Sequence, residues 1–163
     1  LISGDQVIPR ITSNISVMGG EPEANPLKEW LYSLEQLLDT LPPDALVLPA
    51  HNAPFKGLHV RLRQLIEHHE EHLLALEEAC VTSGHTAMDL LPVLFKRELD
   101  QHQVGLALGE CIAHLNYLHQ RGQLERTIDK AGRYRYRSID DTLPMRLRRH
   151  HHEAETENTS ITI

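Results

Sequence analysis

Two short apolar stretches, LISGDQVI (residues 1–8) and DALVLPAH (residues 44–51), decide the fold class. Each contains a β-branched residue and is bounded by Gly, Pro or Asp, which is typical of a short buried strand. The segment between them has leucines at helical spacing, with Asn25 as a capping residue and Pro26 at the first helical position. A strand, a helix and a second strand in this order predict an α/β fold.

The next segment is helical. Apolar residues recur at steps of three and four from Leu58 to Cys80, which predicts a long helix that buries one stripe. Within this helix, His68 and His72 have the spacing of a zinc-protease motif, but the residue after the first histidine is His69 and not the glutamate that such a motif needs. Because glutamates flank the pair, we expect a solvated polar face there.

Residues 83–138 have a different organisation. Thr86 and Asp89 form the pattern of a capping box at the start of one helix of about twelve residues, and Asp100 is placed to cap a second helix. Two alternating segments on either side of Gly132 predict a two-stranded hairpin. Two helices followed by a hairpin are the outline of a winged helix-turn-helix.

The chain is therefore divided into an α/β part, a winged-helix domain and a tail. The α/β part covers residues 1–82 and the winged-helix domain covers residues 83–138. Residues 139–163 have little apolar periodicity, which predicts a disordered tail.

Composition limits the class of protein. A net charge of −7 argues against nucleic-acid binding over the whole surface. No apolar run approaches the roughly 20 residues of a membrane-spanning helix, so we expect no membrane partner. The two cysteines, Cys80 and Cys111, are too few for a disulfide framework and fall on apolar helix positions, so we expect buried free thiols. This fits a cytoplasmic protein.

Asp5 and His51 share a context, because each follows an apolar strand, in SGD and in LPAH. In α/β sheets, ligand sites gather outside the carboxyl ends of the strands. Carboxylate oxygen and imidazole nitrogen are standard zinc ligands. From spacing alone, a turn residue and a structural histidine are the commoner explanation, and both interpretations stay open.

The sequence around these two residues resembles a known family. LISGDQVIPRITSNISV (1–17), EPEANPLKEWLYSLEQL (21–37) and LVLPAHNAPFKGLHVRLRQLIEHHEEHL (46–73) are similar to the C-terminal half of the metallo-β-lactamase fold hydrolases, which form an αββα sandwich. The closer resemblance is to the branch of glyoxalase II-like proteins and β-lactamase-like protein 2, which carries a C-terminal winged-helix domain. The resemblance runs from Leu1 to about Arg137.

On this resemblance, Asp5 matches the aspartate that bridges two metal ions, and His51 matches the last histidine ligand. The resemblance implies two zinc ions and a metal-bound hydroxide that attacks an ester, thioester or phosphodiester. The family's main signature, H-x-H-x-D-H, does not occur in the sequence. A catalytic zinc takes three protein ligands and a water, so we predict that this chain alone is an inactive fragment. Half of a sandwich exposes strand edges, so we also expect self-association.

The alternative function is nucleic-acid binding by the winged helix. Strand alternation predicts Arg133, Arg135 and Arg137 on one face of the hairpin, with Tyr134 and Tyr136 on the other. A row of arginines can bind phosphates, and it is equally typical of a solvated edge strand. The resemblance implies either a small-molecule substrate or single-stranded RNA as the partner.

Overall fold

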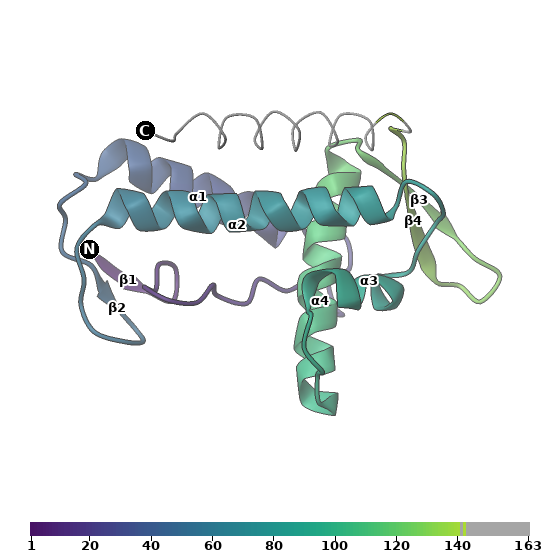
Figure 1. Ribbon diagram of the computed structural model, residues 1–163, viewed down its shortest axis with the longest axis horizontal. Coiled ribbons are helices and arrows are strands. Elements are labelled where there is room, and N and C mark those ends of the chain that lie inside the picture. Colours follow the sequence, from purple (N-terminus) through teal and green to yellow (C-terminus); the bar gives the residue numbers. More distant parts are fainter. Residues whose placement is uncertain (141, 143–163) are drawn as a thin grey trace, which may run out of the picture.

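The structure, a computed structural model, describes residues 1–140 and residue 142. Two strands lie at one end of the molecule, two long helices run side by side along it, and a further pair of helices with a hairpin forms the other end (Figure 1). The helices and strands are, in chain order, β1 (Ile2–Gly4), α1 (Pro26–Thr40), β2 (Leu48–Pro49), α2 (Leu58–Ala79), α3 (Ala87–Leu94), α4 (Gln101–Gln120), β3 (Leu124–Ile128) and β4 (Tyr134–Ser138).

The first two strands pair in parallel, as the α/β prediction requires, with Ile2 opposite Leu48 and Gly4 opposite Pro49. Both strands are shorter than the apolar stretches that predicted them. Gly4 has a positive φ of 55°, which turns the chain away after the third residue of β1. On β2, Leu48 and Ala50 donate to β1, so the nitrogen of Pro49, which carries no hydrogen, lies on the other side of the strand. The sheet therefore ends just before Asp5 on one strand and His51 on the other.

The predicted caps are present where the sequence placed them. The Asn25 side chain accepts a hydrogen bond from the Lys28 N–H at the start of α1. A capping box closes the start of α3 through Thr86 and Asp89, and another closes α4 through Asp100. The first of these helices is shorter than the sequence predicts, because α3 ends at Leu94 and not near residue 97. Its interior residue Pro92 lacks a helical N–H donor, and α3 ends within the next turn.

Two apolar clusters form the core. One lies at the strand end and joins buried residues of α1 and α2 to Val7 and Val47. The other joins α1 and α2 to α3, α4 and the hairpin, with Leu76, Leu115 and Tyr136 among its buried members. Trp30 and Ile66 pack against both clusters. The two clusters are therefore continuous across α1 and α2.

The C-terminal hairpin is antiparallel, and its backbone pairs with the segment that joins α2 to α3. Arg126 lies opposite Tyr136 in the register of β3 and β4, and His85 pairs with Tyr136 from the segment before α3. Gly132 has a positive φ of 77° in the turn, as predicted. The order of two helices and a hairpin is thus confirmed, whereas the winged-helix assignment and the boundary after residue 82 stay predictions.

Other predictions concern the cysteines, the tail and the membrane. Cys80 and Cys111 are free and buried, as expected. Apart from residues 139, 140 and 142, the predicted disordered tail lies outside the described residues. In the part of the chain that the structure describes, no helix combines the length and the apolar character needed to cross a bilayer.

Candidate metal centre

Asp5 is held in a tight turn at the end of β1. The Gln6 N–H donates to the Ser3 carbonyl oxygen over 2.9 Å, and the Ser3 hydroxyl donates to the Val7 carbonyl over 2.8 Å. The Ser13 hydroxyl donates to the main-chain carbonyl of Asp5 itself. These bonds use the backbone of the turn and leave the Asp5 carboxylate free to face outward.

His51 lies in the loop that follows β2. Val47 and Phe55 exchange two backbone hydrogen bonds of 2.9 and 3.0 Å, and this pair closes the loop. Asn52 takes a left-handed conformation with φ 71°, which reverses the chain directly after His51. The Ala50 N–H donates to the Gly4 carbonyl over 2.9 Å and joins the two loops. The parallel pairing of the strands thereby brings the two predicted ligand residues to one edge.

The two side chains face each other. His51 Nε2 lies 3.3 Å from Asp5 Oδ1, and the side chains are 69% and 64% exposed, respectively. This distance is longer than an ordinary N–H···O hydrogen bond. In a tetrahedral zinc site, with ligand atoms roughly 2.0–2.2 Å from the metal, two ligand atoms lie about 3.4 Å apart. The donor types and their separation therefore fit a shared divalent metal.

The pair is not a complete metal site. Among residues 1–140 and 142, no group of three or more His, Cys, Asp or Glu side chains is arranged to hold a metal ion. Since catalytic zinc needs three protein ligands, Asp5 and His51 together supply part of a centre.

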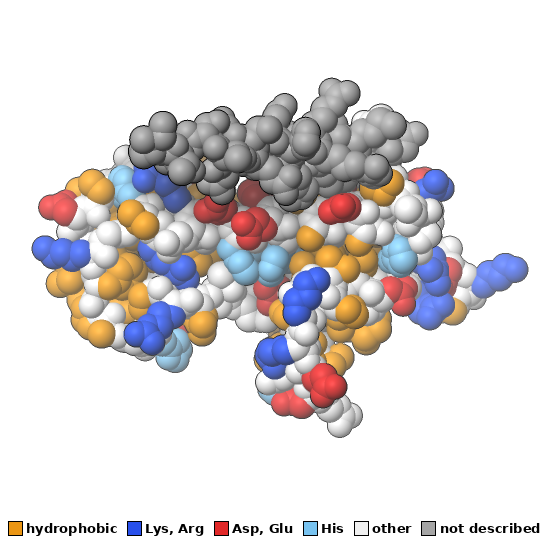
Figure 2. All heavy atoms as spheres, in the orientation of Figure 1, with side chains coloured by type: hydrophobic (Ala, Val, Ile, Leu, Met, Phe, Trp, Pro, Cys, Tyr) orange, Lys and Arg blue, Asp and Glu red, His pale blue; other side chains and the backbone are white. Residues whose placement is uncertain are grey.

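The histidines of α2 lie elsewhere, and the prediction of a solvated face for them was wrong in part. The neighbouring glutamates are exposed, namely Glu67, Glu70 and Glu71. Acidic side chains are visible on the surface along α2 in Figure 2. His68 and His72, however, are half-buried, with ring centroids 4.1 Å apart. The reason is that α4 crosses α2 (Figure 1), and His114 of α4 lies against His69 and His72 of α2.

A buried histidine pair lies at this crossing. His114 Nδ1 is 2.8 Å from the Glu110 carbonyl oxygen, and His114 Nε2 is 3.0 Å from His69 Nδ1. Because a carbonyl only accepts, His114 donates from Nδ1 and accepts at Nε2 from His69. His69 Nε2 is then an acceptor with no hydrogen-bond partner among the described residues. The two rings are a fully buried, neutral pair.

Burial sets the protonation of this cluster. It lowers the pKa of His69 to about 3 and the pKa values of His72 and His114 to about 4, with repulsion from neighbouring histidines as a further cause. Burial also raises the pKa of the nearby Glu110 carboxyl to about 7. A hydrogen bond from the Asn14 side chain lowers this pKa, but its effect is the smaller of the two. Neutral rings in mutual contact stabilise the crossing of two helices, and we assign this cluster a structural role.

The hairpin arginines are only partly available for phosphates. Arg133 lies in the turn before β4, and its Nη2 is 2.9 Å from Asp129 Oδ2. Arg135 also contacts Asp129, and it donates to the Gly84 carbonyl over 2.9 Å. Arg137 is exposed on β4. Asp129 therefore compensates part of the positive charge on which the nucleic-acid alternative depends.

Two features of the helical end escaped the sequence interpretation. The partner of His69, His114, comes from a different helix and has no distinctive local pattern. A cavity beside α4 was also missed, although Gly105 and Gly109, four residues apart within a predicted helix, are a signal that could have indicated it.

Comparisons with known proteins agree with the predicted resemblance. Residues 73–139 match the family model described as "Metallo-beta-lactamase-like, C-terminal domain". The crystal structure of a beta-lactamase domain protein from Burkholderia ambifaria is 46% identical, with a TM-score of 0.82 over 85% of this chain and 41% of that one. A metallo-beta-lactamase family protein from Thermus thermophilus is 29% identical, with a TM-score of 0.70 over 84% of this chain and 41% of that one. No curated protein matches.

These matches support the coarser part of the sequence prediction. The chain spans 41% of the length of the two solved structures and resembles the C-terminal half of a metallo-beta-lactamase.

Proposed function

We propose that this chain is one part of a dinuclear metal-dependent hydrolase, in which Asp5 and His51 are metal ligands. The observation that supports the proposal most directly is the 3.3 Å approach of Asp5 Oδ1 and His51 Nε2 at the ends of two adjacent parallel strands. The similarity to metallo-beta-lactamase structures supports metal binding as the function of this pair.

Each residue has a distinct task in this proposal. His51 would hold a metal ion through its Nε2 nitrogen. Asp5 would hold metal through its carboxylate, whose Oδ1 faces this nitrogen. When bound, the divalent ions, which we take to be zinc, supply an activated water for attack on an ester, thioester or phosphodiester. The exposure of both side chains leaves room for further ligands and for the substrate.

The remaining ligands have to come from outside residues 1–140. The described residues contain no third ligand at this site, and the chain covers 41% of each similar structure. We therefore propose that a second polypeptide segment completes the centre and that this chain alone has no hydrolytic activity. Ester hydrolysis by the purified chain that is abolished by His51→Ala would overturn this part.

Zinc binding at the pair can be tested one histidine at a time. The sequence contains three consecutive histidines at 150–152, which bind divalent metals in their own right. These are replaced by alanine, and the histidine ring signals are followed by NMR during addition of zinc. We expect the His51 signals to move first and to need several-fold more zinc in Asp5→Asn.

Exposed histidines away from the pair are the internal control. His102 is exposed on α4 and its ring signals are expected to stay in place at the zinc concentration that moves His51. If His51 and His102 respond alike, or if Asp5→Asn leaves the His51 response unchanged, the proposed ligand pair is wrong.

A further inference from the structure

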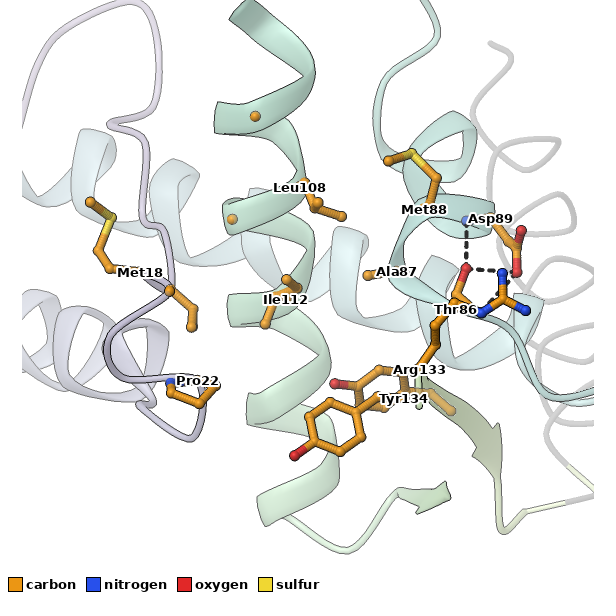
Figure 3. A pocket seen from close by; sticks show the side chains of 15 residues that line it. Met18, Pro22, Thr86, Ala87, Met88, Asp89, Leu108, Ile112, Arg133 and Tyr134 are labelled. Atoms are coloured by element: carbon orange, nitrogen blue, oxygen red, sulfur yellow. Dashed lines mark hydrogen bonds between the residues drawn. The ribbon is translucent and has the colours of Figure 1, made fainter. Parts of the chain in front are cut away.

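A cavity of about 710 Å³ lies beside α4, and neither Asp5 nor His51 lines it. Leu108 and Ile112 of α4 form its centre, Met18 and Pro22 lie on one side, and Met88 of α3 lies on the other (Figure 3). The two strands that carry the candidate metal centre are at the opposite end of the molecule (Figure 1). Its volume is in the range of small-molecule sites, roughly 300–1,000 Å³.

Two glycines of α4 line this cavity. Gly105 lines the cavity in the interior of the helix, and a Cβ atom added there would meet no heavy atom within 4 Å. Glycine is less favourable than alanine at such a position, because it loses more backbone freedom on folding. Gly109, one turn later, differs, since a Cβ there would lie 2.9 Å from the Ser16 side chain. Packing thus explains Gly109, whereas at the exposed position of Gly105 a larger side chain has room beside the cavity.

The wall is apolar, and two charged side chains, Asp89 and Arg133, lie at its edge. Asp89 lines the cavity, but its Oδ2 already accepts hydrogen bonds from the Thr86 N–H and hydroxyl. Arg133 has a side chain that is 60% exposed, and its Nε and Nη2 contact Asp129. No hydrogen bond of its Nη1 is present among the described residues, so this group can donate to a ligand. An anionic oxygen is the partner that a guanidinium donor favours.

We propose that this cavity binds an apolar small molecule that carries one anionic group. The apolar body lies over α4 between the two methionines, Met18 and Met88, whose flexible thioether side chains adapt to different ligand shapes. The anionic group lies at Arg133. This ligand site is independent of the candidate metal centre.

Decanoate is a suitable probe, with decanol as its uncharged counterpart. Binding to the full chain is measured by displacement of the fluorescent apolar anion 1-anilinonaphthalene-8-sulfonate and by calorimetry. We expect one site per chain and decanoate affinity at least about tenfold weaker in Gly105→Leu, whose side chain would start at a Cβ that meets no heavy atom within 4 Å and would narrow the cavity. His102→Leu adds the same side chain to an exposed position of α4 that does not line the cavity, and it should bind like the original protein.

A second variant tests the anionic group. Arg133→Gln is expected to weaken decanoate about fivefold or more and to leave decanol unchanged, since decanol has no charged group for the guanidinium to bind. The melting temperature of Gly105→Leu should not fall below that of the original protein, which separates loss of the cavity from loss of the fold. Equal decanoate binding by Gly105→Leu, or no binding at millimolar decanoate, would overturn the proposal.

Two further outcomes count against it. If decanoate and decanol lose affinity equally in Arg133→Gln, the anionic part is wrong. If the original protein sediments as a dimer that Gly105→Leu converts to monomers, the cavity is covered by a second copy of the chain and not by a small molecule.

Discussion

At the strand end of the molecule, Asp5 and His51 lie 3.3 Å apart with both side chains exposed, whereas at the helical end His69 and His114 lie 3.0 Å apart and are fully buried. The exposed pair has little packed around it and is open to additional ligands. The buried pair is enclosed by two helices and is neutral. We therefore expect different roles for the two pairs, because burial differs between them.

The apolar residues of the two ends differ in the same way. Ile2 of β1 is 84% exposed, whereas Leu115 of α4 is completely buried. We expect Leu115→Ala to reduce the free energy of unfolding by about 4 kcal/mol, because it leaves a cavity in the core. Ile2→Ala should change it by less than about 0.5 kcal/mol. Urea unfolding of both variants measures the difference.

Ile2→Ala also tests the comparison itself. If this substitution destabilises the protein as much as Leu115→Ala does, the exposed strand is covered in solution, as the expected self-association would require. Light scattering of the same samples then shows whether a second copy provides the cover.

Acid should weaken the helical end. The lowered pKa values of His69, His72 and His114 mean that the unfolded chain binds more protons than the folded chain below pH 6.5, so stability falls as the pH falls. Each histidine contributes a loss of roughly 2 kcal/mol between pH 7 and pH 5. The contribution of Glu110 to the pH dependence of stability has the opposite sign. As the pH falls, its raised pKa lets the folded chain bind a proton at this carboxyl before the unfolded chain does. This gain offsets the loss of stability from about one histidine.

The measurement is the urea midpoint at pH 7 and at pH 5. We expect a net loss of about 3 kcal/mol for the original protein on acidification, and a smaller loss for His69→Gln, which removes one of the three groups. His102→Gln, on the exposed face of α4, should follow the original protein. Stability that is equal at both pH values would contradict a neutral buried cluster.

The smallest effect is expected at the hairpin. Asp129 contacts both Arg133 and Arg135, and the net charge of the chain is −7. Replacing Arg133, Arg135 and Arg137 by alanine should therefore change binding of single-stranded RNA by less than about threefold at physiological salt. Fluorescence anisotropy with a labelled oligonucleotide measures this. Tight, salt-dependent binding that the triple variant loses would favour the nucleic-acid alternative over the hydrolase proposal.

The local features of this protein follow from its sequence. Asn25, Thr86 and Asp100 cap the helices that their positions predict, because a cap depends on residues two or three positions away. The meeting of Asp5 and His51 was also predictable, since parallel neighbouring strands end at the same edge of a sheet. The strand lengths were less predictable, because β1 ends where Gly4 takes a positive φ.

The tertiary structure decided which polar groups are buried and what they contact. His69 and His114 are 45 residues apart in the sequence, and only the crossing of α2 and α4 brings them together. At the same crossing, histidines of α2 are half-buried although exposed glutamates flank them in the sequence. The cavity beside α4 likewise needs three separate segments around Gly105. Hydrogen bonds within a turn of chain are set by the sequence alone, whereas burial depends on how distant elements pack, and burial sets the charge and the role of each side chain here.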